Sequence, residues 1–141
     1  MVIYFAGAIK GDTRFQNNFK DIIKFLSSQG HTPLSELNEN FKTAIPLTER
    51  QIFKRDIKWL EQSNAVIAEI SGASLGVGFE ISFALYNLKI PVLALYSSQA
   101  ERVSAMITGC DSKRLTVKEY SDKAEMEKFV SSFLKKIQEN I

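Results

Sequence analysis

The sequence contains little of several features, and each scarcity excludes a class of structure or function. The single cysteine, Cys110, rules out an intramolecular disulfide and a zinc site built from cysteines. No apolar run approaches the roughly 20 residues that cross a bilayer, and Val2 enters a strand pattern without a basic leader sequence. The net charge is only +2, which is too small to favour binding to nucleic acids.

The rest of the composition is that of an ordinary globular protein. Hydrophobic residues make up 45% of the chain and charged residues 24%, proportions typical of proteins that fold around an apolar core. A length of 141 residues suits one domain that buries such a core. We therefore expect a single domain over residues 1–141, located in the cytoplasm, that binds neither a membrane nor a nucleic-acid polymer.

Short apolar segments alternate with amphipathic ones along the chain. Strand patterns fall at residues 2–6, 31–37, 65–68, 92–96 and 115–120. Helical patterns fall at residues 15–30, 48–63, 80–88, 98–109 and 126–141. Strands that alternate with helices form a parallel sheet covered on both faces. The sequence therefore predicts a flavodoxin- or Rossmann-like three-layer α/β/α sandwich, with five parallel strands in the order 2-1-3-4-5.

A turn rich in glycine and serine follows the apolar strand 65–68. Residues 71–78 hold three glycines and two serines, and such a turn exposes backbone N–H groups to a ligand. The positive end of the following helix dipole favours an anion at the same place. Glu80 adds a carboxylate in or near the first turn of that helix. This combination suggests a site for a phosphorylated sugar.

A second glycine-bearing loop, Gly7–Gly11, follows the first strand. In the expected strand order the first and third strands are neighbours, and ligands of such sheets bind beyond the carboxyl ends where the order reverses. The two loops should therefore face one cleft. The loop Gly7–Gly11 does not have the nucleoside-triphosphate signature, because no Gly-Lys-Ser/Thr follows it.

Several side chains are candidates for chemistry in this cleft, and each has a structural alternative. Asp56 lies on the apolar side of its helix, where a carboxylate is costly unless it has partners, and it could simply cap a neighbouring backbone group. Tyr4 could be a core residue, and Glu80 could only stabilise a helix dipole. Glu69 could support the site or be a paired buried acid. Together, two carboxylates at one cleft suit glycoside chemistry, with one as nucleophile and the other handling a proton.

Five segments of the chain carry a resemblance to a known family. They are Tyr4–Gly11, Asp56-x-x-Trp59-Leu60, Val66-x-Ala68-Glu69, Ser74–Glu80 and Arg102–Gly109. In this order they resemble the nucleoside 2-deoxyribosyltransferase superfamily, specifically its 2′-deoxynucleoside 5′-monophosphate N-glycosidase branch. The resemblance covers nearly the whole chain, and the last two segments are its most specific parts.

The resemblance implies a role for each matching residue. Glu80 matches the nucleophile that forms a glycosyl-enzyme intermediate, Asp56 matches the carboxylate that protonates or orients the leaving base, and Tyr4 matches a hydroxyl beside the sugar. The residues that match the two phosphate loops are Gly7, Ile9, Lys10, Gly11, Ser74 and Gly76. Ser104 matches a serine that reaches the phosphate from a neighbouring subunit, which implies a homodimer with shared sites. No metal or organic cofactor is implied.

The chain departs from the expected branch pattern at three positions. Ala8 replaces a serine, Lys10 replaces an arginine, and Phe79 replaces a tyrosine. Without the hydroxyl and the planar guanidinium, bidentate recognition of the phosphate is lost, although Lys10 still supplies a point charge.

We expect hydrolysis of the N-glycosidic bond of 2′-deoxynucleoside 5′-monophosphates, which gives a free base and 2-deoxyribose 5-phosphate. Three alternatives stay open. The first is a transferase that moves deoxyribose between bases of unphosphorylated nucleosides. The second is a ribonucleotide N-glycosidase that acts on substrates such as cytidine monophosphate. The third is a nucleotide-binding module without turnover.

Overall fold

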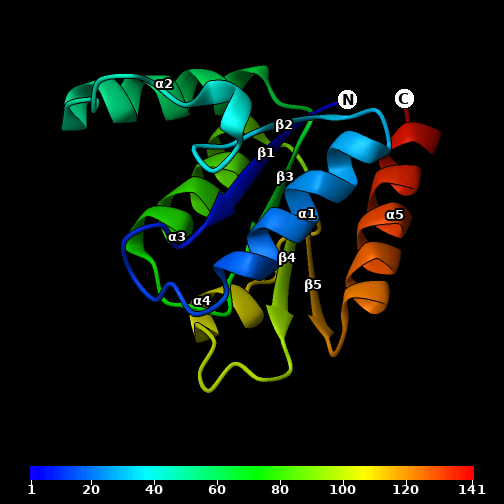
Figure 1. Cartoon of the computed structure of the whole chain (residues 1–141). Helices are drawn as coiled ribbons and strands as arrows, with labels where there is room; N and C mark the ends of the chain where they lie inside the picture. Colours follow the sequence, from blue (N-terminus) through cyan, green and yellow to red (C-terminus); the bar gives the residue numbers. More distant parts are fainter.

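The computed structural model describes residues 1–141 and contains one five-stranded parallel sheet (Figure 1). Its strands are β1 (Val2–Gly7), β2 (Thr32–Leu34), β3 (Ala65–Glu69), β4 (Val92–Ser97) and β5 (Leu115–Tyr120). They lie in the order β2-β1-β3-β4-β5, and every neighbouring pair is parallel. The predicted fold class and strand order are therefore confirmed.

Helices cover both faces of the sheet. They are α1 (Gln16–Ser28), α2 (Glu49–Gln62), α3 (Leu75–Ser82), α4 (Ala105–Thr108) and α5 (Lys123–Glu139), with the 3₁₀ turn η1 (Glu39–Phe41) and the π-helical segment η2 (Phe83–Leu88). The helices α1 and α5 pack on one face, and α2 and α3 pack on the other. None of the helices combines the length and the apolar character needed to cross a membrane.

Alternation along the strands divides the apolar core into two layers. On β1, Phe5 faces the layer beneath α1 and α5, whereas Tyr4 faces the layer beneath α2 and α3. All five residues of β3 are buried, as expected for a central parallel strand with helices on both faces. The orientation of Tyr4 matters for the site, because it places the phenol on the same side of the sheet as α2 and α3.

Polar side chains mark where two of these helices begin. A capping box begins α2: the hydroxyl of Thr48 accepts from the backbone N–H of Gln51 at 3.2 Å, and the Gln51 side chain accepts from the N–H of Thr48 at 2.9 Å. The Ser74 hydroxyl accepts from the N–H of Val77 at 3.2 Å and starts α3 at Leu75. Glu80 therefore lies in the second turn of α3, and the helix predicted from residue 80 begins five residues earlier, because the serine cap starts it within the glycine-rich segment.

The predicted helix over residues 98–109 is wrong for most of its length. Only α4, at Ala105–Thr108, is helical. The start of this segment is a turn, in which the hydroxyl of Ser97 accepts from the N–H of Gln99 at 3.1 Å and the carbonyl of Ser97 accepts from the N–H of Ala100 at 3.0 Å. Such local side-chain bonds compete with the helical pattern of backbone bonds.

A buried carboxylate ties together the carboxyl ends of three strands. Glu69 is fully buried, and its oxygens accept from the backbone N–H of Ser71 at 2.7 Å, from the Ser71 hydroxyl at 2.9 Å and from the Tyr120 hydroxyl. The Ser71 hydroxyl in turn accepts from the N–H of Ser97 at 2.7 Å. Burial raises the pKa of Glu69 above its usual range. The cluster joins the ends of β3, β4 and β5 and holds Ser71, the second residue after β3.

Removing the phenol from this cluster should destabilise the fold. We expect Tyr120→Phe to lower the free energy of unfolding by about 1–3 kcal/mol, because a buried carboxylate loses one of its donors. Urea denaturation would measure the change. Tyr96→Phe on β4 is the matched control, since the Tyr96 hydroxyl is not part of the cluster. Equal stability of the two variants would show that the phenol is not needed to satisfy Glu69.

Candidate active site

A cleft lies at the carboxyl ends of β1 and β3, where the strand order reverses. Its walls come from the loops after β1 and β3, from one side of α2 and α3, and from the segment around α4. This is the position that the predicted topology indicates for a ligand site. All of the candidate residues line this cleft: Tyr4, Gly7, Ile9, Lys10, Gly11, Asp56, Ser74, Gly76, Glu80 and Ser104.

Tyr4 and Glu80 form the centre of the cleft. The Tyr4 hydroxyl donates a hydrogen bond to Oε2 of Glu80 across the boundary between β1 and α3. Burial raises the pKa of Glu80 from its usual 4.5 to about 7; the bond from Tyr4 acts in the opposite direction, and the charge of Asp56 adds to the rise. Burial also raises the pKa of Tyr4, so this phenol keeps its proton. Tyr4 is thus both a core residue, 4% exposed, and a donor to the carboxylate.

Asp56 is the second carboxylate of the cleft. It is half-buried on α2, and Nε of the neighbouring Arg55 donates to its Oδ1 at 3.0 Å. Burial raises the pKa of Asp56, while the bond and the charge of Arg55 act against the rise. The negative charge of Asp56 raises the pKa of both Tyr4 and Glu80. Two carboxyl groups that line one cleft suit a nucleophile and a group that handles a proton.

The two glycine-bearing loops touch each other through their backbones. A Cβ on Gly11 would lie 2.4 Å from the carbonyl oxygen of Ala73, and a Cβ on Gly72 would lie 2.6 Å from the carbonyl oxygen of Asp12. Both contacts are too close for any side chain, so glycine is required at these two positions. Because Glu69 holds the start of one loop, this packing fixes the other loop as well.

The remaining candidates stand at the rim of the cleft. Lys10 and Ser104 are exposed, and the Ser104 hydroxyl makes no capping bond to α4. The Ser74 hydroxyl accepts a bond from α3 and keeps its own proton free for a ligand. No group of three histidine, cysteine, aspartate or glutamate side chains is arranged to hold a metal ion.

Sequence reasoning missed two charged residues of the cleft, Glu36 and Arg55. Both line it, and Nη2 of Arg55 lies 3.4 Å from Oε2 of Glu36. The guanidinium of Arg55 also lies over the ring of Trp59, 4.6 Å from its centroid. The spacing in the sequence was the available signal. Arg55 stands four residues before Trp59, which places these two side chains on one face of a helix, and it directly precedes Asp56.

Comparisons with known proteins show the family to which this chain belongs. Residues 3–129 match the model of the family described as nucleoside 2-deoxyribosyltransferase. A Methanosarcina barkeri protein named as a 2′-deoxynucleoside 5′-phosphate N-hydrolase is 37% identical over 138 residues, which cover 94% of this chain and 84% of that protein. The 5-hydroxymethyl-dUMP N-hydrolase of Esox lucius is 31% identical over 142 residues, which cover 96% of this chain and 97% of that protein.

A solved structure shares the fold. The CMP N-glycosidase of Clostridium botulinum superposes with a TM-score of 0.71 over 94% of this chain and 99% of that chain, at 18% sequence identity. At that identity, the likeness concerns the fold alone.

The raised pKa of Glu80 predicts how stability depends on pH. Between pH 4.5 and 7 the unfolded chain loses the proton of Glu80 while the folded chain keeps it, so this group's contribution to stability falls as the pH rises through that window. In Glu80→Gln the side chain does not ionise, so the variant does not lose stability in this way as the pH rises. We therefore expect the variant to be more stable than the parent at pH 8, by about 3 kcal/mol, with the gain disappearing toward pH 4.5.

Urea denaturation at the two pH values would measure this difference. Glu61→Gln, at an exposed position of α2, controls for the loss of one negative charge. A stability gain of the same size at pH 4.5 and pH 8 would contradict the burial of an ionisable Glu80.

Proposed function

Because this chain belongs to the nucleoside 2-deoxyribosyltransferase family, we propose that it hydrolyses the N-glycosidic bond of 2′-deoxynucleoside 5′-monophosphates. The products are a free base and 2-deoxyribose 5-phosphate. One observation carries the proposal: the Tyr4 hydroxyl is bonded to the Glu80 carboxylate in the cleft that Asp56 and the two glycine-bearing loops also line. The printed names of the curated relatives support the same substrate class.

The reaction follows from the roles that we assign to the two carboxyl groups. Ionised Glu80 attacks the anomeric carbon, so that a carbon–oxygen ester bond forms as the bond to the base breaks, and the base leaves with the electron pair. Asp56 protonates the base or orients it. Water then hydrolyses the ester, which returns Glu80 as a carboxylate. The sugar lacks a 2′-hydroxyl, which eases positive charge at the anomeric carbon, and the Tyr4 hydroxyl keeps the nucleophile in place.

The 5′-phosphate would anchor the substrate between the two loops. We assign its binding to backbone N–H groups, to the Ser74 hydroxyl and to the charge of Lys10. The backbone positions involved are Gly7, Ile9, Gly11 and Gly76. The glycine contacts between the loops support this assignment, because they hold the two backbones in one rigid unit. Phosphate binding far from the reacting bond then positions the anomeric carbon against Glu80.

Measurement of base release tests the proposal. Chromatography would follow deoxynucleoside monophosphates, ribonucleoside monophosphates, and unphosphorylated deoxynucleosides with an acceptor base. We expect release from the deoxynucleotides, a loss of at least about 1,000-fold in Glu80→Gln because the nucleophile is gone, and slower release in Asp56→Asn. Exchange of bases on free deoxynucleosides would identify a transferase instead. Release from ribonucleotides alone would identify a ribonucleotide N-glycosidase, and binding without release would identify a nucleotide-binding module.

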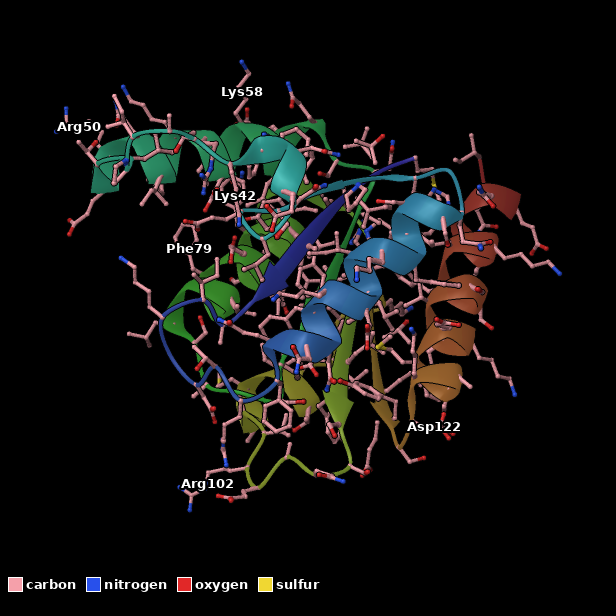
Figure 2. All side chains as sticks on the ribbon, in the orientation of Figure 1. Lys42, Arg50, Lys58, Phe79, Arg102 and Asp122 are labelled. Carbon is pink, nitrogen blue, oxygen red and sulfur yellow. The ribbon has the colours of Figure 1, made fainter.

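We further propose a homodimer in which Ser104 serves the site of the partner subunit. Large apolar side chains are exposed around the cleft: Leu75 is 97% exposed and Met106, two residues from Ser104, is 83% exposed. A row of aromatic rings runs from Phe53 on α2 to Phe79 and Phe83, with successive centroids 6.1 Å apart, and Phe79 is visible in this region of Figure 2. Exposed apolar surface of this kind favours a protein interface.

Mixing two inactive variants tests the shared site. In a heterodimer of Glu80→Gln with a Ser104→Tyr subunit, one of the two sites has both native residues. Random pairing should therefore restore about a quarter of the parent activity, because half of the dimers are mixed and each has one intact site. Each variant alone is the control. Sedimentation as a monomer at micromolar concentration, or no recovery on mixing, would contradict the shared site.

A further inference from the structure

Two carbonyl groups of the loop after β1 are held from the side of α1. Nε2 of Gln16, the first residue of α1, donates to the carbonyl oxygen of Ala8 at 3.4 Å and to that of Ile9 at 3.3 Å. A side-chain amide nitrogen carries two hydrogens, so it can bond to both carbonyls at once. Both carbonyls therefore point toward α1.

The packing of α1 fixes the position of this amide. Phe19 follows Gln16 by three residues, which places the two side chains on the same side of the helix. Phe19 is fully buried, and its ring fills the space beside Gly7, where a Cβ atom would lie 2.7 Å from Cε2 of the ring. The start of the loop and the amide that holds it are thus parts of one packed unit.

The directions of two backbone N–H groups follow from these bonds. The chain contains no cis peptide bond, and in a trans peptide the C=O of one residue and the N–H of the next point in opposite directions. Because the carbonyls of Ala8 and Ile9 point toward Gln16, the N–H groups of Ile9 and Lys10 point away from it. Neither N–H donates to a carbonyl of the chain. Successive N–H groups that point the same way form a concavity that binds anions.

The side of the loop away from Gln16 is the side of the cleft. Ile9, Lys10 and Gly11 line the cleft, whereas Ala8 and Gln16 do not. The methyl group of Ala8 is fully buried in the core layer beneath α1, so position 8 offers a ligand no side-chain group. What this loop presents to a ligand is therefore its backbone N–H groups and the charge of Lys10.

We propose that Gln16 is a positioning residue for the 5′-phosphate, and that it acts through the backbone of the loop after β1. The proposal deepens the proposed function and rests on the phosphate site assigned there. By holding two carbonyls on the side of α1, the amide keeps the N–H groups of Ile9 and Lys10 directed at the phosphate before the nucleotide binds. Without the amide the two peptide units can rotate, and a carbonyl oxygen turned toward the cleft repels the phosphate. Such preorganisation reduces the free energy that binding loses to ordering of the loop.

This role makes Gln16 a determinant of the preference for phosphorylated nucleotides. The carboxylates Glu80 and Asp56 belong to α3 and α2, which cover the opposite face of the sheet from α1. Loss of the amide should therefore leave the groups that act on the sugar and the base in place. A nucleoside without a phosphate should bind to a Gln16 variant as well as to the parent.

Phosphate inhibition and kinetics of Gln16→Met test the inference, because methionine has a similar length and no donor. We would measure the inhibition constant of inorganic phosphate, kcat/KM for the deoxynucleoside monophosphate that the parent hydrolyses fastest, and the inhibition constant of the matching unphosphorylated deoxynucleoside. The inhibition constant of phosphate should rise and kcat/KM should fall, each by about tenfold, the scale of one hydrogen bond to a charged group. The inhibition constant of the deoxynucleoside should stay unchanged.

NMR spectra of the backbone amides give a readout that does not require turnover. In the parent, inorganic phosphate should shift the amide signals of Ile9 and Lys10, and Gln16→Met should need about tenfold more phosphate for the same shift. Gln29→Met makes the same chemical change at an exposed position just after α1, and it should match the parent in every measurement. Gln16→Ala removes the same donor and carries the comparison if Gln16→Met does not fold.

Unchanged phosphate binding in Gln16→Met, or an equal loss for phosphate and for the unphosphorylated deoxynucleoside, would overturn the inference and leave the proposed function intact. In that case Gln16 only supports the packing of α1. A parent whose Ile9 and Lys10 signals do not respond to phosphate would also overturn the inference. A parent that binds phosphate through these amides but releases no base from any deoxynucleotide would instead overturn the proposed function alone.

Discussion

The hydrogen bond from the Tyr4 hydroxyl to the Glu80 carboxylate is the contact on which the site depends. It joins the first strand of the sheet to the helix that follows the central strand, two segments separated by 76 positions in the sequence. Burial raises the pKa of the carboxyl group to about 7, and the phenol offsets part of that cost while holding the oxygen in place. A carboxylate kept weakly hydrated and oriented in this way is suited to attack a carbon atom.

The surroundings of this pair are rigid for reasons that can be traced to a few residues. Glu69 binds Ser71, two residues further along the chain, and the phenol of Tyr120, so the loop after β3 begins at a fixed point. Gly11 and Gly72 then let the two loops meet backbone to backbone. On the opposite wall, Arg55 lies between Trp59 and Asp56. The cleft therefore has a wall of backbone groups on one side and a wall of charged side chains on the other.

Much of the fold could be predicted because its signals are local. The spacing of Thr48 and Gln51 is typical of a capping box and indicates the start of α2. The apolar run of β3 indicates a strand that is buried on both faces. The predicted helix over 98–109 was wrong because composition does not reveal the turn that the Ser97 hydroxyl closes. The start of α3 was predicted five residues too late, because glycines at positions 76 and 78 made helical residues resemble a loop.

By itself, the sequence determined the strand order, the two glycine-bearing loops and the identity of the candidate carboxylates, because periodicity and turn chemistry are properties of short segments. Only the tertiary structure decided that Tyr4 bonds to Glu80 and that the pKa of Glu80 rises, because both depend on burial and on residues distant in the chain. It also decided that Nη2 of Arg55 is buried without a hydrogen-bond partner. Whether a donor finds a partner depends on every group packed around it, which no spacing of residues records.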